Sequence, residues 1–300
     1  MQSMYTVERY GTGIGSDPVC TGKSVCILEG SAIHYGVSFV SHPLRKKRLK
    51  YKLPSTMFME RTNSGVPGFD EIIGGGFPKG TCCLITGTAG SGKTTFAVQF
   101  LHNGITQFGE NGLYVSLEER PKDLRKEMIN FGWDLKKLEN NKKLAIIDAG
   151  SSRDRIRTDE QYSLRGMGPR INISALSAHI YEVCKKIDAK RIVIDSIPSL
   201  QLKLRDESEV RRATSLLTNL LLEMEKTSLI ITEIADPHEF SRYGFEEYVT
   251  RGVVVMRLIP QYGELKRTLQ VMKMRGTNHS TRTYPIKITS KGIVVNSQKS

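Results

Sequence analysis

The sequence has no apolar run of membrane-spanning length, so it predicts no transmembrane helix and no membrane partner. Its first residues also lack the apolar core of a secretory signal peptide. The five cysteines are scattered and none forms a C-x-x-C pair, which argues against a zinc ribbon and against a disulfide scaffold. From these absences we expect a protein of the reducing cytoplasm.

Aromatic residues are few, whereas Lys and Arg outnumber Asp and Glu by 44 to 31, giving a formal charge of +13. A basic balance fits either a nucleic-acid partner or a solvated basic surface. No aromatic cluster accompanies the basic residues, so the sequence lacks a platform on which bases could stack. Nucleic acid therefore stays an open partner, but it is not the favoured one.

Residues 1–56 differ from the rest because they show no long amphipathic period and close on a basic run at 45–52. Three interpretations stay open: a disordered extension, a basic arm for nucleic acid or an acidic partner, and sequence upstream of a natural start at Met57 or Met59. We favour the first and the third. The expected organisation is a basic extension at 1–56 and one domain at 57–300.

The chain is organised around residues 87–94, Gly-Thr-Ala-Gly-Ser-Gly-Lys-Thr, which fit the phosphate-binding loop G-x-x-x-x-G-K-[ST]. A strand pattern at 81–86 precedes the loop, and apolar residues at helical spacing follow it over 94–108. A strand that turns through glycines into a helix points N–H groups at one spot, where they hold a di- or triphosphate. We expect Lys93 to reach the β- and γ-phosphates and the Thr94 hydroxyl to ligate Mg²⁺. The predicted ATP-binding residues of this stretch are Gly87, Thr88, Ala89, Gly90, Ser91, Gly92, Lys93, Thr94 and Thr95.

Strand and helix patterns alternate along the rest of the chain. Strands are predicted at 112–117, 143–148, 191–195, 228–233, 252–258, 265–274 and 284–295, and helices at 121–131, 173–187 and 207–226. This alternation predicts an α/β fold, a mostly parallel twisted sheet with helices on both faces and a C-terminal antiparallel extension. Polar loops are expected at 151–170 and 197–212.

Carboxylates end two of the predicted strands. Asp195 closes the strand at 191–195, where it can hold Mg²⁺ directly or through water beside the phosphate-binding loop. Glu118 and Glu119 follow the strand at 112–117, on the edge where ligands of open α/β folds bind. Hydrolysis of a nucleoside triphosphate needs a group that orients or deprotonates water. The two glutamates fit that role, and equally a structural role at the positive start of the next helix.

Several stretches in order resemble the KaiC branch of the RecA-type ATPases. They are 65–70, 87–94, 115–119, 131–134, 194–196, 241–244 and 273–279. The resemblance covers residues 61–295 and implies a RecA-type P-loop ATPase that converts ATP and water to ADP and phosphate with Mg²⁺. It also implies a homo-oligomeric ring, a hexamer, with ATP between subunits and with Glu118 and Glu119 as catalytic residues.

The resemblance further implies that Lys273 and Arg275 act across the subunit interface, where they neutralise charge on the neighbour's γ-phosphate. Apart from the resemblance, both residues also fit a solvated strand end. Other implied nucleotide contacts are Met274, Thr277, His279, Asn130, Thr289 and Ser290, although the side chains of the last three depart from the family's.

Other departures limit what the resemblance implies. The cyanobacterial clock protein carries two such domains, and the positions of its phosphorylated Ser–Thr pair are Glu247 and Tyr248 here, so we expect no autokinase activity by that route. The cysteine zinc motif of bacterial RadA is absent. We therefore expect an ATP-driven regulatory or signalling switch with an unidentified protein partner. The alternatives are a RecA- or RadA-like DNA-binding accessory of recombination or repair, and a nucleotide-gated binding module with negligible turnover.

Overall fold

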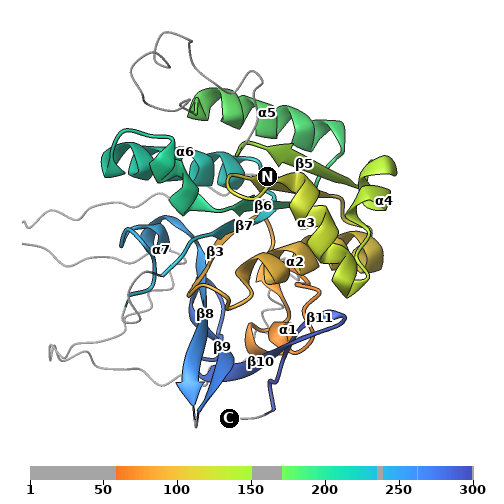
Figure 1. Cartoon of the computed structure of the whole chain (residues 1–300), viewed down its shortest axis with the longest axis vertical. Coiled ribbons are helices and arrows are strands. Elements are labelled where there is room, and N and C mark those ends of the chain that lie inside the picture. Colours follow the sequence, from red (N-terminus) through yellow and green to blue (C-terminus); the bar gives the residue numbers. More distant parts are fainter. Residues whose placement is uncertain (1–58, 151–170, 235–238, 262, 299–300) are drawn as a thin grey trace, which may run out of the picture. The chain divides into compact units, whose positions relative to one another are not determined.

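A computed structural model of the chain describes residues 59–150, 171–234, 239–261 and 263–298, all within one unit that spans 53–300. In the described part, one sheet has the strand order β11-β10-β9-β8-β3-β7-β6-β4-β5 (Figure 1). A short antiparallel pair joins β1 (Arg61–Thr62) to β2 (Phe77–Pro78). The segment predicted at 1–56 and the loop predicted at 151–170 lie outside the described residues, so the boundary at residue 57 stays a prediction.

The parallel half of the sheet is formed by largely buried strands. Its strands are β3 (Cys82–Gly87), β4 (Gly112–Ser116), β5 (Leu144–Asp148), β6 (Arg191–Asp195) and β7 (Thr227–Ile231). Every residue of β3, β4, β6 and β7 is buried, as expected for strands covered on both faces. The register sets Ser116 beside Asp195 and Ile85 beside Ile231, so the carboxyl ends of these strands meet at one edge.

Helices cover both faces of the sheet (Figure 1). On one face lie α1 (Phe69–Ile72), α2 (Lys93–Phe108), α3 (Pro121–Met128), a 3-10 turn (Ile129–Phe131) and α4 (Leu135–Asn140), all of which contribute to one hydrophobic cluster. The second cluster includes α5 (Ile173–Lys186) and α6 (Glu207–Glu223). The predicted α/β fold is thereby confirmed. None of the helices in the described ranges has the length and hydropathy to cross a bilayer.

The helix starts differ in how their N–H groups are satisfied. The Asn172 side chain accepts from Ala175 N–H at the start of α5, and Asp206 accepts from Glu209 N–H at the start of α6. By contrast, α2 follows Gly92 and has no side-chain cap. Its first N–H groups therefore stay open to a ligand.

The antiparallel half consists of β8 (Gly252–Gln261), β9 (Glu264–Met274), β10 (Thr283–Thr289) and β11 (Gly292–Val295), with β8 parallel to β3. β3 pairs with β8 as far as Met256, and β10 pairs with β9 from Thr268 onward. Residues 257–261 and 264–268 therefore pair with each other, and among them only Thr268 still pairs with a further strand, β10. We call these two segments the β8–β9 ribbon.

Two predicted segments need correction. The strand predicted at 284–295 is two strands, because the chain turns at Ser290–Lys291 and Gly292 takes a left-handed φ of +105°. A Cβ there would lie 2.4 Å from Gln99 Oε1, so only glycine fits. Within the loop predicted at 197–212, residues Ile197–Leu202 form a 3-10 helix, whereas α6 begins at Glu207, as the helix predicted at 207–226 requires. A further helix, α7 (Glu246–Val249), precedes β8.

Candidate functional site

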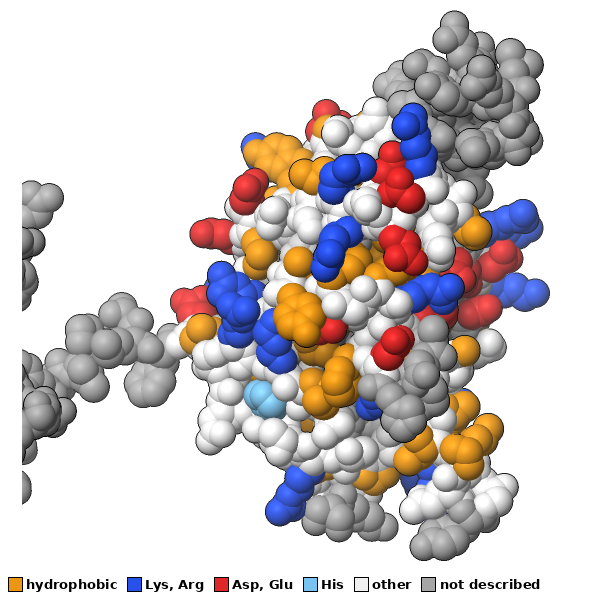
Figure 2. Space-filling view, turned by 90° about the vertical axis from the view of Figure 1, so that its left-hand side faces the viewer, with side chains coloured by type: hydrophobic (Ala, Val, Ile, Leu, Met, Phe, Trp, Pro, Cys, Tyr) orange, Lys and Arg blue, Asp and Glu red, His pale blue; other side chains and the backbone are white. Residues whose placement is uncertain are grey.

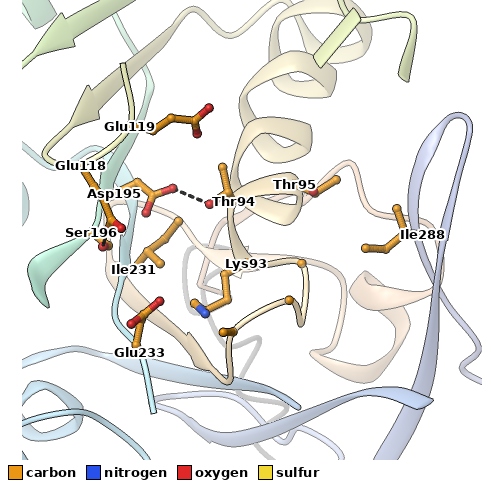
Figure 3. A pocket seen from close by; sticks show the side chains of 13 residues that line it. Lys93, Thr94, Thr95, Glu118, Glu119, Asp195, Ser196, Ile231, Glu233 and Ile288 are labelled. Carbon is orange, nitrogen blue, oxygen red and sulfur yellow. Dashed lines mark hydrogen bonds between the residues drawn. The ribbon is translucent and has the colours of Figure 1, made fainter. Parts of the chain in front are cut away.

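A cavity of about 480 Å³ opens at the carboxyl ends of the parallel strands (Figure 3). This volume lies in the usual range for small-molecule sites. The lining residues are Ala89, Gly90, Gly92, Lys93, Thr94, Thr95, Glu118, Glu119, Asp195, Ser196, Ile231, Glu233 and Ile288. The phosphate-binding loop, the strand-end aspartate and both predicted glutamates therefore meet at one place.

The loop between β3 and α2 has a shape that requires glycine. Gly90 and Gly92 have φ of +74° and +101°, where glycine is unstrained. At Gly87 a Cβ would lie 1.9 Å from the Met256 carbonyl oxygen. Lys93 Nζ donates to the carbonyls of Gly87 and Thr88, each at 3.0 Å. The ammonium group is thus held within the curl of the loop.

Charge in the cavity is unbalanced. Among its described lining residues Lys93 is the one cation, against the carboxylates of Glu118, Glu119, Asp195 and Glu233. Burial lowers the pKa of Lys93, whereas Glu233 and then Asp195 and Glu118 act to raise it. Figure 3 shows the Glu233 carboxylate on the same side of the cavity as the ammonium. An anionic ligand would need further positive charge to enter such a site.

Asp195 is buried and hydrogen-bonded by two hydroxyl groups. Thr94 Oγ1 and Tyr114 Oη each donate to Asp195 Oδ2 at 2.8 Å. Burial raises the pKa of Asp195, and the two hydrogen bonds oppose that rise. The Thr94 hydroxyl and the Asp195 carboxylate together offer the hard oxygen atoms that Mg²⁺ prefers.

Glu119 Oε1, an oxygen of the cavity lining, is buried and has no hydrogen-bond partner among the described residues, so it also fits a bound ion or its water. The same residues contain no group of three or more His, Cys, Asp or Glu side chains able to hold a metal alone.

The two glutamates after β4 have different surroundings. Glu118 Oε2 accepts from Ser196 Oγ at 2.7 Å and from Ser199 Oγ at 2.8 Å, which fixes its carboxylate. Burial raises the pKa of Glu119 to about 7, and negative charge at Glu127 and Asp195 adds to that rise. Neighbouring carboxyl groups in such unlike environments can divide the roles of base and proton carrier.

Some residues of the cavity lining were not predicted from the sequence. Glu233 follows the apolar strand β7 much as Glu118 follows β4, so the rule that identified one carboxylate could have identified the other. Ser196 directly follows Asp195 and lines the cavity. Ile231 ends β7, whereas Ile288 comes from β10, and neither position carried a local signal.

Other predicted residues lie outside the cavity lining. Lys273 Nζ donates to the carbonyls of Glu247 and Thr250, each at 2.7 Å. Thr277 Oγ1 accepts from Arg61 Nη1 at 2.7 Å. Also outside the lining are Gly87, Thr88 and Ser91 of the loop, and Asn130, Met274, Arg275, His279, Thr289 and Ser290. Roles in nucleotide binding stay predictions for all of these residues.

The chain matches the family described as "ATPase: KaiC" over residues 62–300. It is similar to the crystal structure of a KaiC-like protein from the hyperthermophilic archaeon Pyrococcus horikoshii OT3, with 46% identity and a TM-score of 0.69 over 79% of this chain and 99% of that one.

Two curated relatives are clock proteins. The circadian clock protein KaiC3 of a Synechocystis species is 40% identical over 240 residues, which cover 79% of this chain and 46% of that protein. The circadian clock oscillator protein KaiC of Synechococcus elongatus is 39% identical over 229 residues, which cover 76% of this chain and 42% of that protein. This chain thus spans about half the length of the curated relatives it matches.

Proposed function

Because the chain belongs to the KaiC family of RecA-type ATPases, we propose that it hydrolyses ATP to ADP and phosphate, with Mg²⁺, at the subunit interfaces of a ring. We further propose that this turnover drives a regulatory or signalling switch in the cytoplasm. The observation that carries the proposal is the meeting of Lys93, the Thr94–Asp195 pair and two dissimilar glutamates in one cavity.

The phosphate-binding loop and the uncapped N-terminus of α2 bind the phosphates. The uncapped N–H groups of α2 and the positive end of its dipole favour an anion. Lys93 would exchange the carbonyls of Gly87 and Thr88 for phosphate oxygens. Mg²⁺, held by Thr94 and Asp195, would offset negative charge on the β- and γ-phosphates.

Water activation falls to Glu118. Its carboxylate is oriented by two serine hydroxyl groups on the cavity wall, so it can accept a hydrogen bond from a water molecule near the γ-phosphate. Glu119, with a pKa of about 7, supports it and can take up a proton near neutral pH.

Lys273 and Arg275 are proposed to complete a neighbouring subunit's site. Within its own subunit, Lys273 is tied to two carbonyl groups near α7, while Arg275 is exposed. An exposed arginine beside a fixed lysine suits the stabilisation of charge that develops on a γ-phosphate.

Autokinase activity is not part of the proposal. Glu247 accepts a hydrogen bond from Ser241, and Tyr248 is 73% exposed. Neither residue is the serine or threonine that the family's autokinase route would modify.

No observation favours the DNA-binding alternative. Of the two predicted polar loops, which would face DNA under this alternative, 151–170 lies outside the described residues and 197–212 is largely helical. On the face drawn in Figure 2, Lys and Arg side chains alternate with Asp and Glu and form no continuous basic stripe.

The deciding experiment is the double substitution Glu118→Gln with Glu119→Gln. It should preserve Mg·ATP binding and reduce hydrolysis by about 100-fold or more, because the group that orients water is lost. Glu182→Gln, at an exposed position of α5, is the control and should leave turnover unchanged. Normal hydrolysis in the double variant would refute the assignment. Binding without turnover in the unaltered protein would instead favour a nucleotide-gated binding module.

A further inference from the structure

The phosphate-binding loop is held from outside the cavity by the β8–β9 hairpin. Thr88 N–H donates to the Met256 carbonyl at 3.2 Å, and Leu258 N–H donates to Thr88 Oγ1 at 3.0 Å. From the opposite strand, Arg267 Nε donates to the Gly90 carbonyl at 3.0 Å. Two strands that lie far from the loop in sequence thus contact it at two positions.

The contact from Arg267 fixes one peptide group of the loop at both ends. The carbonyl of the Gly90–Ser91 peptide accepts from Arg267, and its N–H donates to the Thr88 carbonyl at 3.3 Å. Gly90 has no Cβ and a left-handed φ, so little else in its own backbone prevents this peptide from rotating. A rotated carbonyl would turn its oxygen toward the place where phosphates bind and repel them.

We propose that Arg267 is a positioning residue for the polyphosphate chain of the bound nucleotide. It lies outside the cavity lining, fixes the Gly90–Ser91 peptide and adds a positive charge behind the loop. A loop that is already ordered loses less conformational freedom when the ligand binds. The inference rests on the proposed function of the cavity as an ATP site and adds a residue to its binding apparatus.

The chemistry of the contact predicts which ligands should respond. Loop amides of this type cradle the α- and β-phosphates. Loss of Arg267 should therefore lower the affinities for ATP and ADP by a similar factor and lower the affinity for AMP less. The groups that orient water, Glu118 and its two serine donors, lie after β4 and after β6 and should be undisturbed.

The ribbon offers a matched control in Arg257. Arg257 and Arg267 lie on adjacent strands, where Arg257 pairs with Thr268 and Leu258 with Arg267. Arg257, however, donates to the Glu239 carbonyl at 3.1 Å and stacks over Phe240. Replacing it removes the same charge from the same ribbon without touching the loop.

The test compares Arg267→Ala, Arg267→Lys and Arg257→Ala in the full chain with Mg²⁺ present. Arg267→Ala should raise the Kd for ATP and for ADP by about tenfold or more, because a charged hydrogen bond is lost. Turnover at saturating ATP should stay within about twofold of the unaltered protein. Arg267→Lys keeps the charge and should recover part of the affinity, and Arg257→Ala should bind as the unaltered protein does.

Two outcomes would overturn the inference. One is nucleotide affinity in Arg267→Ala equal to that of Arg257→Ala. The other is that Arg267→Ala and Arg257→Ala both lower the turnover at saturating ATP and the Tm of the nucleotide-free protein. That result would show that the arginines of the ribbon have a structural role only. If Arg267→Ala does not fold, Arg267→Lys is judged by the same Kd and turnover criteria. Failure of the unaltered chain to bind Mg·ATP would refute the proposed function and this inference with it, whereas normal ATP binding with no effect at Arg267 would refute the inference alone.

Discussion

Most of the predicted functional residues of the parallel half of the sheet line the cavity, whereas those of the antiparallel half lie outside it. In the parallel half, Lys93 at the start of α2, Glu118 after β4 and Asp195 at the end of β6 meet around one cavity. In the antiparallel half, Lys273 and Thr277 are hydrogen-bonded within their own chain and lie outside that cavity.

Under the proposed function, one subunit would therefore assemble only part of the machinery. Parallel strands bring their carboxyl ends together by geometry alone, so a site at that edge needs no second copy. The residues at the end of β9 have no such edge to share and would depend on a neighbour. Each prediction below tests one side of this contrast.

The largest effect is expected at Lys93. Lys93→Ala removes the one cation among the described lining residues, so Mg·ATP affinity should fall by about 100-fold or more. Lys136→Ala, an exposed lysine of α4, is the control and should not change affinity. Equilibrium binding measures the ATP affinity of both variants. If Lys93→Ala still bound ATP tightly, the role assigned to Lys93 in phosphate binding would be wrong.

A smaller but clear effect is expected for Lys273→Ala combined with Arg275→Ala. Turnover should fall by about 10- to 100-fold while each subunit still binds ATP, because only charge stabilisation across the interface is lost. Mixing this variant with Glu118→Gln/Glu119→Gln should restore part of the activity, since each variant supplies what the other lacks. If mixing restores nothing although the two variants assemble together, action across the interface is wrong.

The smallest effect concerns Glu119 in the protein free of nucleotide and metal. Its folded pKa of about 7 lies above the ordinary value of 4.5, so folding disfavours its charged form. The ionised Glu119 therefore lowers the free energy of unfolding. This effect is absent below pH 4.5, grows between pH 4.5 and 7, and is complete above pH 7. Glu119→Gln should therefore raise the Tm by about 1–3 °C at pH 8 and leave it unchanged near pH 4.5.

Glu118→Gln is the matched control for this measurement. Its carboxylate accepts two serine hydrogen bonds, so the substitution should bring no gain in Tm at pH 8. An equal shift for Glu119→Gln at both pH values would contradict the stated cause, because a neutral side chain cannot relieve charge where none is present.

The sequence predicted the features that depend on local pattern. The phosphate-binding loop was recognisable because its glycines, lysine and flanking elements are contiguous. Asp195 was placed correctly at the cavity because the carboxyl ends of parallel strands share an edge. The α/β fold with its mostly parallel sheet followed from the alternation of strand and helix patterns, whereas its RecA type was implied by the resemblance.

Features that join distant residues could not be predicted. The serine donors to Glu118 lie about 80 positions along the chain, and Arg267 reaches Gly90 across 177 positions. The turn before Gly292 depends on the approach of Gln99 and Trp133, which no local pattern encodes. The 3-10 helix at Ile197–Leu202 was missed because it is short and contains a proline.

A rotation of the β8–β9 ribbon about its base would move its tip far more than it would move Arg267. The five residue pairs of the ribbon, from Arg257–Thr268 to Gln261–Glu264, extend roughly 15 Å at the usual rise per strand residue. Arg267 belongs to the second pair from the base, close to the pivot. A swing of several ångströms at the tip would thus reach Gly90 as a displacement of about one ångström, the scale on which the grip on a phosphate is made or lost.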